Sequence, residues 1–403
     1  MADTRALRTP LSLNILTGGF LLVWSVIAVF PLFWIAVMSF RVPIDALSSN
    51  PGTVLFGPRT RALSGGLSVL DLVLWIALLV VLYTAPKSYG ERVAAQLAPV
   101  GRPLWGWIFA ALAYFVAAAV LLFWLMPLLT WGINRVLSGV PLLGLLAQPL
   151  IGTTFEHYRA VWIEHEFYRN FLNSMLVTAG VVTISLTVGT LAGYALARAH
   201  SSLAFWLLIT ALIFRALPHS VLVTGYIPPF INSREWLAPL WNSAFTGWFF
   251  HLFSQVPPSL YGQPWAIIIV LVSINQPFTI WMMRSFFENI PPELDEAARV
   301  DGCTHFEAFW RVIMPVMWPG VITTGLFSFL LAYNDYLVTA LLLDAQSQTM
   351  VPAISQFLNR DTKGSDQIEA IAAAVSITAP LFLLVMLFQK QIVSGLTQGA
   401  VKG

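Results

Sequence analysis

The chain has 403 residues, of which 58% are apolar and only 10% are charged. Soluble domains carry about 25% charged residues, so this composition excludes an ordinary soluble protein and indicates a polytopic membrane protein. The formal net charge is +2 and the basic residues form no run, so we expect no nucleic-acid partner.

The N-terminal segment has the features of a retained membrane span. Arg5 and Arg8 precede an apolar run from Leu11 to Phe40. That run is longer than the roughly 7–15 apolar residues of a cleavable signal peptide. We therefore predict a first span whose N-terminal end faces the cytoplasm.

An apolar run of about 20 residues can cross a bilayer as a helix, because each residue rises about 1.5 Å through a core of about 30 Å. Eight such runs predict membrane spans, and they cover residues 13–39, 67–85, 104–130, 171–197, 203–227, 264–287, 318–343 and 367–389. The second is the weakest, because Asp71 lies near its start. Residues 136–151 are also apolar, but Pro141 and Pro149 interrupt them, so we predict an interfacial segment or a re-entrant turn there.

Residues 291–320 differ from the rest of the chain and predict two short amphipathic helices between long apolar segments. Pro291 and Pro292 suit a helix start, and the acidic residues that follow favour the N-terminal end of the helix dipole. Gly302 is expected to end this first helix in the left-handed conformation. Leu294, Ala297 and Ala298 are predicted to share a face, and the two small alanines would let the backbone of a partner come close.

The second helix of this loop is predicted to begin at Thr304, since Thr304 and Glu307 have the spacing of a capping box. Pro315 is expected to limit its extent. Four of its apolar residues are predicted to share one face: Phe306, Phe309, Trp310 and Ile313.

This loop carries a resemblance to a known family. The sequence Glu296-Ala297-Ala298, with Gly302 six residues after the glutamate and Pro315 beyond it, resembles the EAA loop of ABC importer permeases. The resemblance extends over residues 155–403 and is closest to the carbohydrate-uptake class, such as the permease subunits for maltose and for glycerol phosphate. It rests also on Asn173-Ser174 with residues 193–198, on residues 214–218 with Ile227-Pro228, on residues 277–287, on Ala332-Tyr333-Asn334-Asp335-Tyr336 and on the terminus 395–403.

The resemblance implies an all-α, six-helix transmembrane core in an assembly of two permeases and two ATPases, fed by an extracytoplasmic solute-binding protein. It also implies that the first helix of the loop is a coupling helix seated in a groove of the ATPase, and that residues 396–403 reach the ATPase dimer. The residues expected at this ATPase-coupling site are Glu296, Ala297, Ala298, Gly302, Arg299, Asp301 and Pro315. ATP and Mg would then be bound by the partner ATPase, with no cofactor in this chain.

The chain departs from the family pattern in two places. Residues 41–150 are far longer than the usual first external segment, and residues 232–263 are enlarged. We therefore expect three parts: an N-terminus with the first span (1–40), an insertion with two extra spans (41–150) and the permease core (151–403), with the coupling loop at 288–318. About eight spans result.

Span number and basic residues together suggest the topology. An even number of spans places both termini and the coupling loop in the cytoplasm of a bacterial-type cell, with the chain in the inner membrane. Lys87, Arg92 and Arg102 in the connection of the extra pair agree with this, although Arg41, Arg59 and Arg61 would then lie outside.

Polar residues within spans are costly and usually face the bundle interior or a wet cavity. The candidates for the substrate pathway are Arg215, Tyr226, Asn275, Gln276, Tyr333, Asn334, Asp335 and Tyr336. Amides and carboxylates would bind sugar hydroxyls, and the tyrosine rings would pack on the C–H faces of a sugar. The alternative is that these polar groups only form hydrogen bonds between helices.

The chain lacks the sequence signatures of catalysis. It has no P-loop sequence, no His-Glu-x-x-His pair and no Gly-x-Ser-x-Gly turn, so we expect no enzymatic activity. The single cysteine, Cys303, excludes an intramolecular disulfide and is expected to have no chemical role. The histidines are scattered along the chain and are likewise expected to have no chemical role; they lie at positions 157, 165, 200, 219, 251 and 305.

The prediction is thus the permease of an ATP-driven importer for a carbohydrate, a polyol or a related solute in the lipid bilayer. One alternative is a non-sugar solute such as a phosphodiester, attracted by Arg215. A second is an ion-coupled secondary transporter that uses Asp71 or Asp335. A third is an integral membrane enzyme. The sequence leaves open the solute, the roles of residues 41–150 and 232–263, and whether the partner permease is identical.

Overall fold

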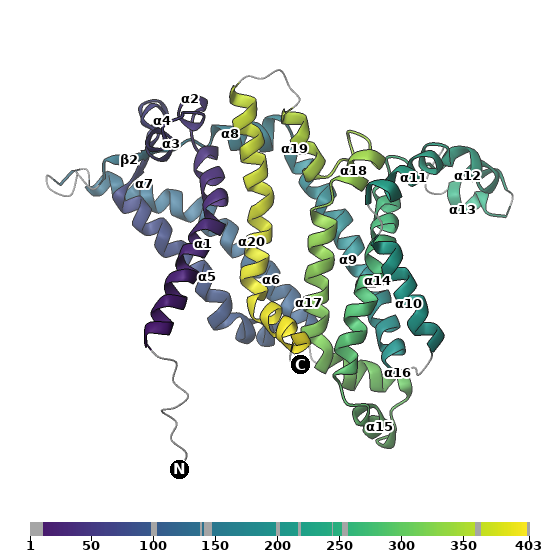
Figure 1. Cartoon of the computed structure of the whole chain (residues 1–403). Coiled ribbons are helices and arrows are strands. Elements are labelled where there is room, and N and C mark those ends of the chain that lie inside the picture. The colour runs from purple at the N-terminus through teal and green to yellow at the C-terminus, as the bar shows by residue number, and fades with distance from the viewer. Residues whose placement is uncertain are drawn as a thin grey trace, which may run out of the picture. The chain divides into compact units, whose positions relative to one another are not determined.

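The computed structural model describes residues 11–97, 103–137, 139–140, 147–198, 202–216, 219–243, 245–251, 257–358 and 364–400. Almost all of its secondary structure is helical (Figure 1). The chain forms two compact units. The first comprises residues 1–73, 133–164 and 357–376, and the second comprises residues 74–132, 165–356 and 377–403.

Six helical segments of the described chain are long and apolar enough to cross a membrane. They are Leu13–Ser39, Val69–Pro86, Phe167–Arg198, Pro264–Glu288, His305–Tyr333 and Gly364–Gln389. Each overlaps a predicted span, so the prediction of a polytopic helix bundle is confirmed. Of the other two predicted spans, 104–130 contains the shorter apolar helix Gly106–Val120, and 203–227 overlaps the shorter apolar helix Val221–Ile231.

Two predicted spans differ from the structure. The run 203–227 is not one helix but two, α10 (Ser202–Arg215) and α11 (His219–Ile231). The break coincides with Pro218, which has no amide hydrogen to donate and lies outside the described residues. The predicted span 318–343 begins and ends too late, because the helix runs from His305 to Tyr333 and residues 337–342 form the separate helix α18 (Leu337–Leu342).

In the first unit, the long apolar helix α1 is followed by three short helices, each of which begins with a proline. The bounds are α1 (Leu11–Ser39), α2 (Pro43–Ala46), α3 (Pro51–Phe56) and α4 (Pro58–Ser64). Proline suits the first position of a helix, where the backbone N–H has no partner within the helix. Asn50 caps α3, because its side chain accepts a hydrogen bond from Gly52 N at 2.9 Å.

The first unit also contains a small antiparallel sheet and two helical turns. Strand β1 (Gly66–Ser68) pairs with β2 (Pro149–Gly152), with Gly66 opposite Gly152, and α8 (Glu156–Arg159) and η4 (Ala160–Glu164) follow. A Cβ at Gly66 would collide with the backbone of Ile151, which explains the glycine. The end of the predicted interfacial segment 136–151 is therefore a strand, while residues 141–146 lie outside the described residues.

A buried arginine holds these short elements together. Arg41 is 2% exposed, and its Nε donates to Val54 O at 2.8 Å and its Nη2 to Leu55 O at 2.6 Å. Its Nη1 donates to Gly152 O in β2. Burial lowers the pKa of Arg41, and the nearby charge of Asp45 opposes that shift. We call residues 41–60 with β2 and α8 the cap.

In the second unit, three long helical segments form the core. They are α9 (Phe167–Arg198), α14 (Pro264–Glu288) and the continuous segment made of α16 (His305–Ala308), the π-helical η5 (Phe309–Ile313) and α17 (Met314–Tyr333). Helices α9 and α14 approach closely at glycines, since a Cβ at Gly193 would lie 2.7 Å from Met283 Cβ. Two apolar clusters, around Val270 and around Met283, fill the space between these helices.

The extra helices of the insertion pack on one another within the second unit. Helix α5 (Val69–Leu97), which begins in the first unit, contributes Leu78 and Leu82 to an apolar cluster. The opposite side comes from a continuous helical segment made of α6 (Pro103–Val120), η2 (Leu121–Leu125) and α7 (Met126–Leu137). Tyr114 OH donates to Leu82 O at 3.0 Å. These contacts agree with an accessory helix pair.

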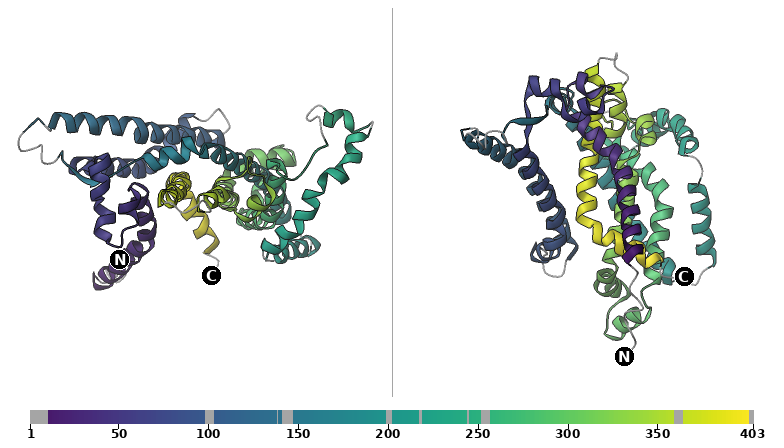
Figure 2. Two further views of the ribbon diagram at one scale, coloured as in Figure 1. Left: turned by 90° about the horizontal axis from the view of Figure 1, so that it is seen from above. Right: turned by 60° about the vertical axis from the view of Figure 1, so that its left-hand side comes forward.

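Within the described part of residues 232–263 lie two helices, α12 (Ser233–Asn242) and α13 (Gly247–His251). Both helices extend away from α9, α14 and α17 (Figures 1 and 2). Trp241 is buried and stacks on His251 at 4.2 Å, whereas Trp236, Phe245 and Trp248 are exposed. The remaining helices of the chain are α15 (Glu293–Val300), α19 (Met350–Leu358) and α20 (Gly364–Ala400).

Candidate functional site: the α15 loop and the ends of the spans

Helix α15 lies beyond the ends of α14 and α17 (Figures 1 and 2). Local chemistry explains where it begins and ends. Pro292 precedes it, and its first turn carries Glu293, Asp295 and Glu296. It ends in a Schellman motif, in which Cys303 N donates to Ala298 O at 3.0 Å and Gly302 N donates to Arg299 O at 3.1 Å.

Gly302 has a φ of +89°, so the predicted left-handed end of the first helix is confirmed. A Cβ at this position would meet no atom within 4 Å. The glycine is therefore required by the backbone conformation and not by crowding. The loop is open around this turn.

The predicted capping box at the start of the second helix is also confirmed. Thr304 Oγ1 accepts from Glu307 N at 3.3 Å, and Glu307 Oε2 accepts from Thr304 N at 3.0 Å. Arg311 adds an ion pair to Glu307 at 3.5 Å. These bonds give α16 a defined first turn.

The expectation that Pro315 would end this second helix is wrong. The helix continues through η5 and α17 to Tyr333. In η5 the bonds skip one more residue than in an α-helix, and Met314 N bonds to Phe309 O. This wider turn directly before Pro315 allows the helix to continue past the proline, which has no backbone N–H to donate.

The predicted faces of the two helices are each divided. Ala298 is buried at 5% exposure, while Ala297 is exposed and Leu294 is 36% exposed, because neighbouring residues in an α-helix point about 100° apart. In the second helix Phe309 and Ile313 are buried, but Phe306 and Trp310 are exposed.

The outward side of the loop combines small, charged and apolar residues. Glu296, Ala297 and Arg299 are exposed, as are Asp301, Gly302 and Pro315. Val300 is 88% exposed and Phe306 is 70% exposed, which is high for apolar side chains at the end of a bundle. The outward side of the loop therefore presents two largely exposed apolar side chains together with its charged residues.

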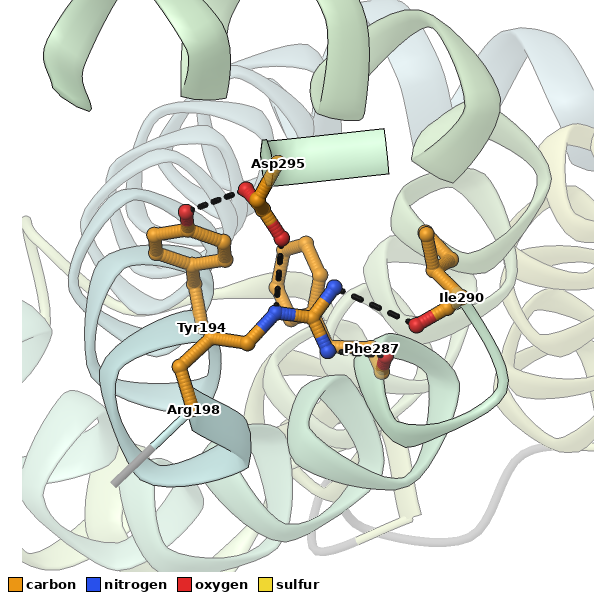
Figure 3. Close-up of polar contacts among 5 residues, drawn as sticks. All are labelled: Tyr194, Arg198, Phe287, Ile290 and Asp295. Atoms are coloured by element: carbon orange, nitrogen blue, oxygen red, sulfur yellow. Dashed lines mark hydrogen bonds and ion pairs between the residues drawn. The ribbon is translucent and has the colours of Figure 1, made fainter. Parts of the chain in front are cut away.

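A polar clasp connects α15 to the ends of two spans (Figure 3). Arg198, the last residue of α9, donates from Nε to Asp295 Oδ2 at 2.8 Å. Its Nη2 donates to Ile290 O at 3.2 Å and its Nη1 to Phe287 O at 3.4 Å, at the end of α14. Tyr194 OH donates to the second carboxylate oxygen, Asp295 Oδ1, at 2.6 Å. We call Tyr194, Arg198 and Asp295 the clasp.

Aromatic rings pack beside the clasp. The ring of Tyr194 lies 4.8 Å from that of Phe309 in η5 and 5.4 Å from that of Phe287 in α14. Arg198 Cζ lies 5.9 Å from the centre of the Tyr194 ring. The side chains of Arg198 and Asp295 are therefore only 21% and 15% exposed.

Sequence reasoning did not find the clasp. Tyr194 and Arg198 were noticed only as part of the family pattern at the end of a span, and Asp295 only as a charge in the first turn of a helix. The available signal was the spacing, because residues 194 and 198 lie one turn apart on the same face of α9. Their partner, 97 residues later, was not predictable from that spacing.

Three of the substrate-pathway candidates lie together. Asn334, Asp335 and Tyr336 line a cavity of about 300 Å³ at the end of α17. The other lining residues are Leu271, Ile274, Leu331 and Leu337. Asp335 Oδ1 accepts from Thr339 N at 3.0 Å, so this carboxylate also orients the start of α18.

The other candidates lie elsewhere. Asn275 is fully buried and donates to Ser328 Oγ of α17 at 2.8 Å. Gln276 Nε2 donates to Ser185 O of α9 at 3.4 Å, and Tyr333 OH donates to Ile377 O at 3.0 Å. These three residues form hydrogen bonds between helices, as expected under the alternative hypothesis that the polar residues stabilise the bundle.

Arg215 and Tyr226 are also outside the lining of the cavity. Arg215 Cζ lies 4.5 Å from the centre of the Phe278 ring, and Tyr226 packs on Phe230 at 6.3 Å between ring centres. Asp71, considered for ion coupling, accepts from Ser68 N and Asn134 Nδ2, each at 2.8 Å, within the first unit.

A bundle of long apolar helices, with a water-exposed helical loop clasped to the ends of its spans, defines a membrane transport permease. The sequence profile described as "Binding-protein-dependent transport system inner membrane component" matches residues 185–398. The chain belongs to this family.

Curated relatives agree with this assignment. The chain is 33% identical over 252 residues to the diacetylchitobiose uptake system permease DasC of Streptomyces coelicolor, covering 62% of this chain and 81% of the relative. It is 32% identical over 256 residues to the trehalose transport permease SugB of Mycobacterium tuberculosis, covering 62% and 82%. The prediction of an ABC importer permease of the carbohydrate-uptake class is confirmed.

Among solved structures, the chain is similar to a bacterial ABC transporter involved in the import of the acidic polysaccharide alginate. The identity is 19% and the TM-score is 0.45, with 70% of this chain and 95% of that chain covered.

Proposed function

We propose that this chain is the permease subunit through which a separate ATPase drives the inward movement of a carbohydrate. The observation that carries the proposal is the α15 loop, which exposes apolar side chains and is clasped to the ends of α9 and α14. A second permease and an extracytoplasmic solute-binding protein would complete the assembly. Relatives named for diacetylchitobiose, trehalose and maltodextrin transport support the choice of a sugar.

The loop has the properties that docking into an ATPase groove requires. Ala297 is exposed and small, so a partner backbone can come close to α15. Glu296 and Arg299 flank it with opposite charges, and Val300 and Phe306 add apolar area that docking would remove from water. ATP and Mg would be bound by the ATPase, and this chain would perform no bond chemistry.

The cavity beside Asp335 suits a sugar on chemical grounds. Leu271 and Ile274 offer an apolar wall for the C–H face of a sugar ring, and Asn334 and Asp335 offer amide and carboxylate groups for hydroxyls. A carboxylate in the lining would repel a phosphodiester. Arg215, on which the anion alternative depends, lies against Phe278 and is not in this lining.

The proposal implies an orientation in the inner membrane. The α15 loop would face the cytoplasm, where ATP is available. The described end of α20 lies at the same end of the second unit as α16, which supports a cytoplasmic C-terminus (Figure 1). An even number of spans would then put the N-terminus on the same side.

The test is to purify the tagged chain in mild detergent, identify the proteins that co-purify and measure ATP hydrolysis. We expect an ATPase and a permease to co-purify. Glu296→Lys and Gly302→Asp should abolish sugar uptake while the bundle stays folded, because both residues are exposed at the loop. A folded chain that purifies alone and transports along an ion gradient would contradict the proposal and favour a secondary transporter.

A further inference from the structure

The α15 loop is connected to the bundle by more than its own backbone. Along the chain it joins only α14 and α16, through residues 289–292 and 301–304. A force on α15 would therefore reach α14 and α17 directly. Helix α9, whose last described residue precedes the loop by almost a hundred positions, is linked to it along the chain only through all the intervening helices.

The clasp connects α9 directly to the α15 loop through side-chain hydrogen bonds. Arg198 bonds at once to α15 through Asp295, to the end of α14 through Phe287 O and to the linker through Ile290 O. The last carbonyl groups of a helix lack partners within the helix, so a cation is well placed beside them. Asp295 lies in the first turn of α15, where the helix dipole favours a negative charge.

The clasp also fixes the rotation of α15 about its own axis. Both carboxylate oxygens of Asp295 are used, one by Arg198 and the other by Tyr194. With Asp295 held inward and Ala298 buried, Glu296, Ala297 and Val300 must point outward. The outward face of α15 is thus held both by the packing of Ala298 and by the bonds from α9 to Asp295.

We propose that Tyr194, Arg198 and Asp295 are positioning residues that transmit movement of the α15 loop to α9 and α14 together. This inference rests on the proposed function, since the loop is taken to dock on an ATPase. The rings of Tyr194, Phe287 and Phe309 add η5 to the same joint. An ATPase that moves α15 therefore moves α9, α14 and the start of α17 as one body.

Variants that break the clasp should lower transport more than ATP hydrolysis. Arg198→Ala and Asp295→Asn break the link to α9, whereas the Schellman motif of α15 and the buried Ala298 still hold its exposed face. The ATPase should therefore still bind and hydrolyse ATP at close to the normal rate. The number of sugar molecules moved per ATP should fall about tenfold, which is within the usual range of coupling energies. Tyr194→Phe removes one hydrogen bond and should lower this ratio by about two- to threefold.

The measurement is sugar uptake and ATP hydrolysis in proteoliposomes that hold the whole complex, with labelled trehalose, maltotriose and diacetylchitobiose as probes. Arg198→Lys should have an intermediate ratio, because an ammonium can bond to Asp295 but cannot also fork to both carbonyls. The matched control is Arg284→Ala. Arg284 forms an ion pair with Glu288 at 2.9 Å within α14 and should leave the ratio unchanged.

Two outcomes would overturn the inference. Unchanged sugar per ATP in Arg198→Ala and Asp295→Asn would show that the clasp transmits nothing. Equal losses of ATPase binding, hydrolysis and uptake, with a constant ratio, would show that the clasp only holds the loop in shape. A wild-type chain that binds no ATPase would instead contradict the proposed function.

Discussion

Two arginines at the ends of long apolar helices, Arg198 as the last residue of α9 and Arg41 two residues after α1, do similar chemistry in different surroundings. Arg198 and Arg41 each donate to backbone carbonyl groups in the last turn of a helix or just after it. Arg198 is one-fifth exposed and is paired with a carboxylate, beside a loop whose apolar side chains are exposed. Arg41 is 2% exposed inside the cap and donates to three carbonyl oxygens.

The difference distinguishes a contact that transmits movement, at Arg198, from a contact that holds a buried structure together, at Arg41. Removing Arg41 leaves buried carbonyl groups without partners, and each such loss is costly. Removing Arg198 leaves the partly exposed carboxylate of Asp295, which keeps its bond to Tyr194, so the loop loses its link to α9 and α14 more than its stability. The cap should therefore respond to mutation by unfolding, and the α15 loop by losing its coupling.

The largest expected effect is on the cap. Arg41→Ala should destabilise it by about 3 kcal/mol or more, because several buried acceptors lose a charged donor together. Hydrogen exchange of residues 41–60 and 149–152 would measure the loss. Arg59→Ala, at an exposed position of α4, is the control and should leave exchange unchanged. Normal protection in Arg41→Ala would remove the basis of the comparison.

A matched pair of glycine substitutions sharpens the comparison. Gly57 in the cap has a φ of +56°, and a Cβ there would lie 2.7 Å from Arg41 Cδ. Gly302 has a φ of +89° but open space around it. Gly57→Ala should therefore cost about 2–3 kcal/mol from strain and crowding, and Gly302→Ala about 1 kcal/mol from strain alone.

Local protection against hydrogen exchange would measure both glycine variants, each in its own segment. The ratio of the two effects is the informative quantity. Equal costs would mean that the cap is less tightly packed than its contacts indicate.

The smallest expected effect is a pH dependence confined to the cap. His157 bonds to Arg41 O at 3.0 Å, and burial lowers the pKa of His157 below its usual value, opposed by that hydrogen bond and by the charges of Glu369 and Glu156. The unfolded cap then binds a proton more readily than the folded cap. Stability is complete above about pH 6.5 and decreases as the pH falls through the lower folded pKa.

Hydrogen exchange of the cap at several pH values, corrected for the intrinsic rate, would test this pH dependence. His157→Gln keeps a neutral side chain and should remove it. A pH dependence that persists in His157→Gln would assign the effect to another group.

Much of the bundle was predictable because span length and apolar composition are direct consequences of bilayer thickness. The ends of α15 were predictable for a different reason, since Gly302 and the Thr304 capping box act on their immediate neighbours. The passage of the helix through Pro315 was not, because it depends on the π-helical turn of η5.

The two arginine sites were harder still to predict. Arg41 was noticed only as a charge outside the membrane, and its acceptors in α3 and β2 are separated by almost a hundred residues. The partners of Arg198 likewise come from another part of the chain. Contacts of this kind depend on tertiary structure, and no local pattern in a single sequence encodes them.

The continuous helix from His305 to Tyr333 also has a mechanical consequence. At about 1.5 Å per residue, its 29 residues make a rod of roughly 43 Å. One end carries the exposed Phe306, and the other meets the cavity at Asn334. A tilt of about 5° at the loop end would displace the cavity end by about 4 Å, comparable to the rise of one helical turn. A small rotation at the loop that we propose as the docking site would thus displace residues that line the cavity at Asn334.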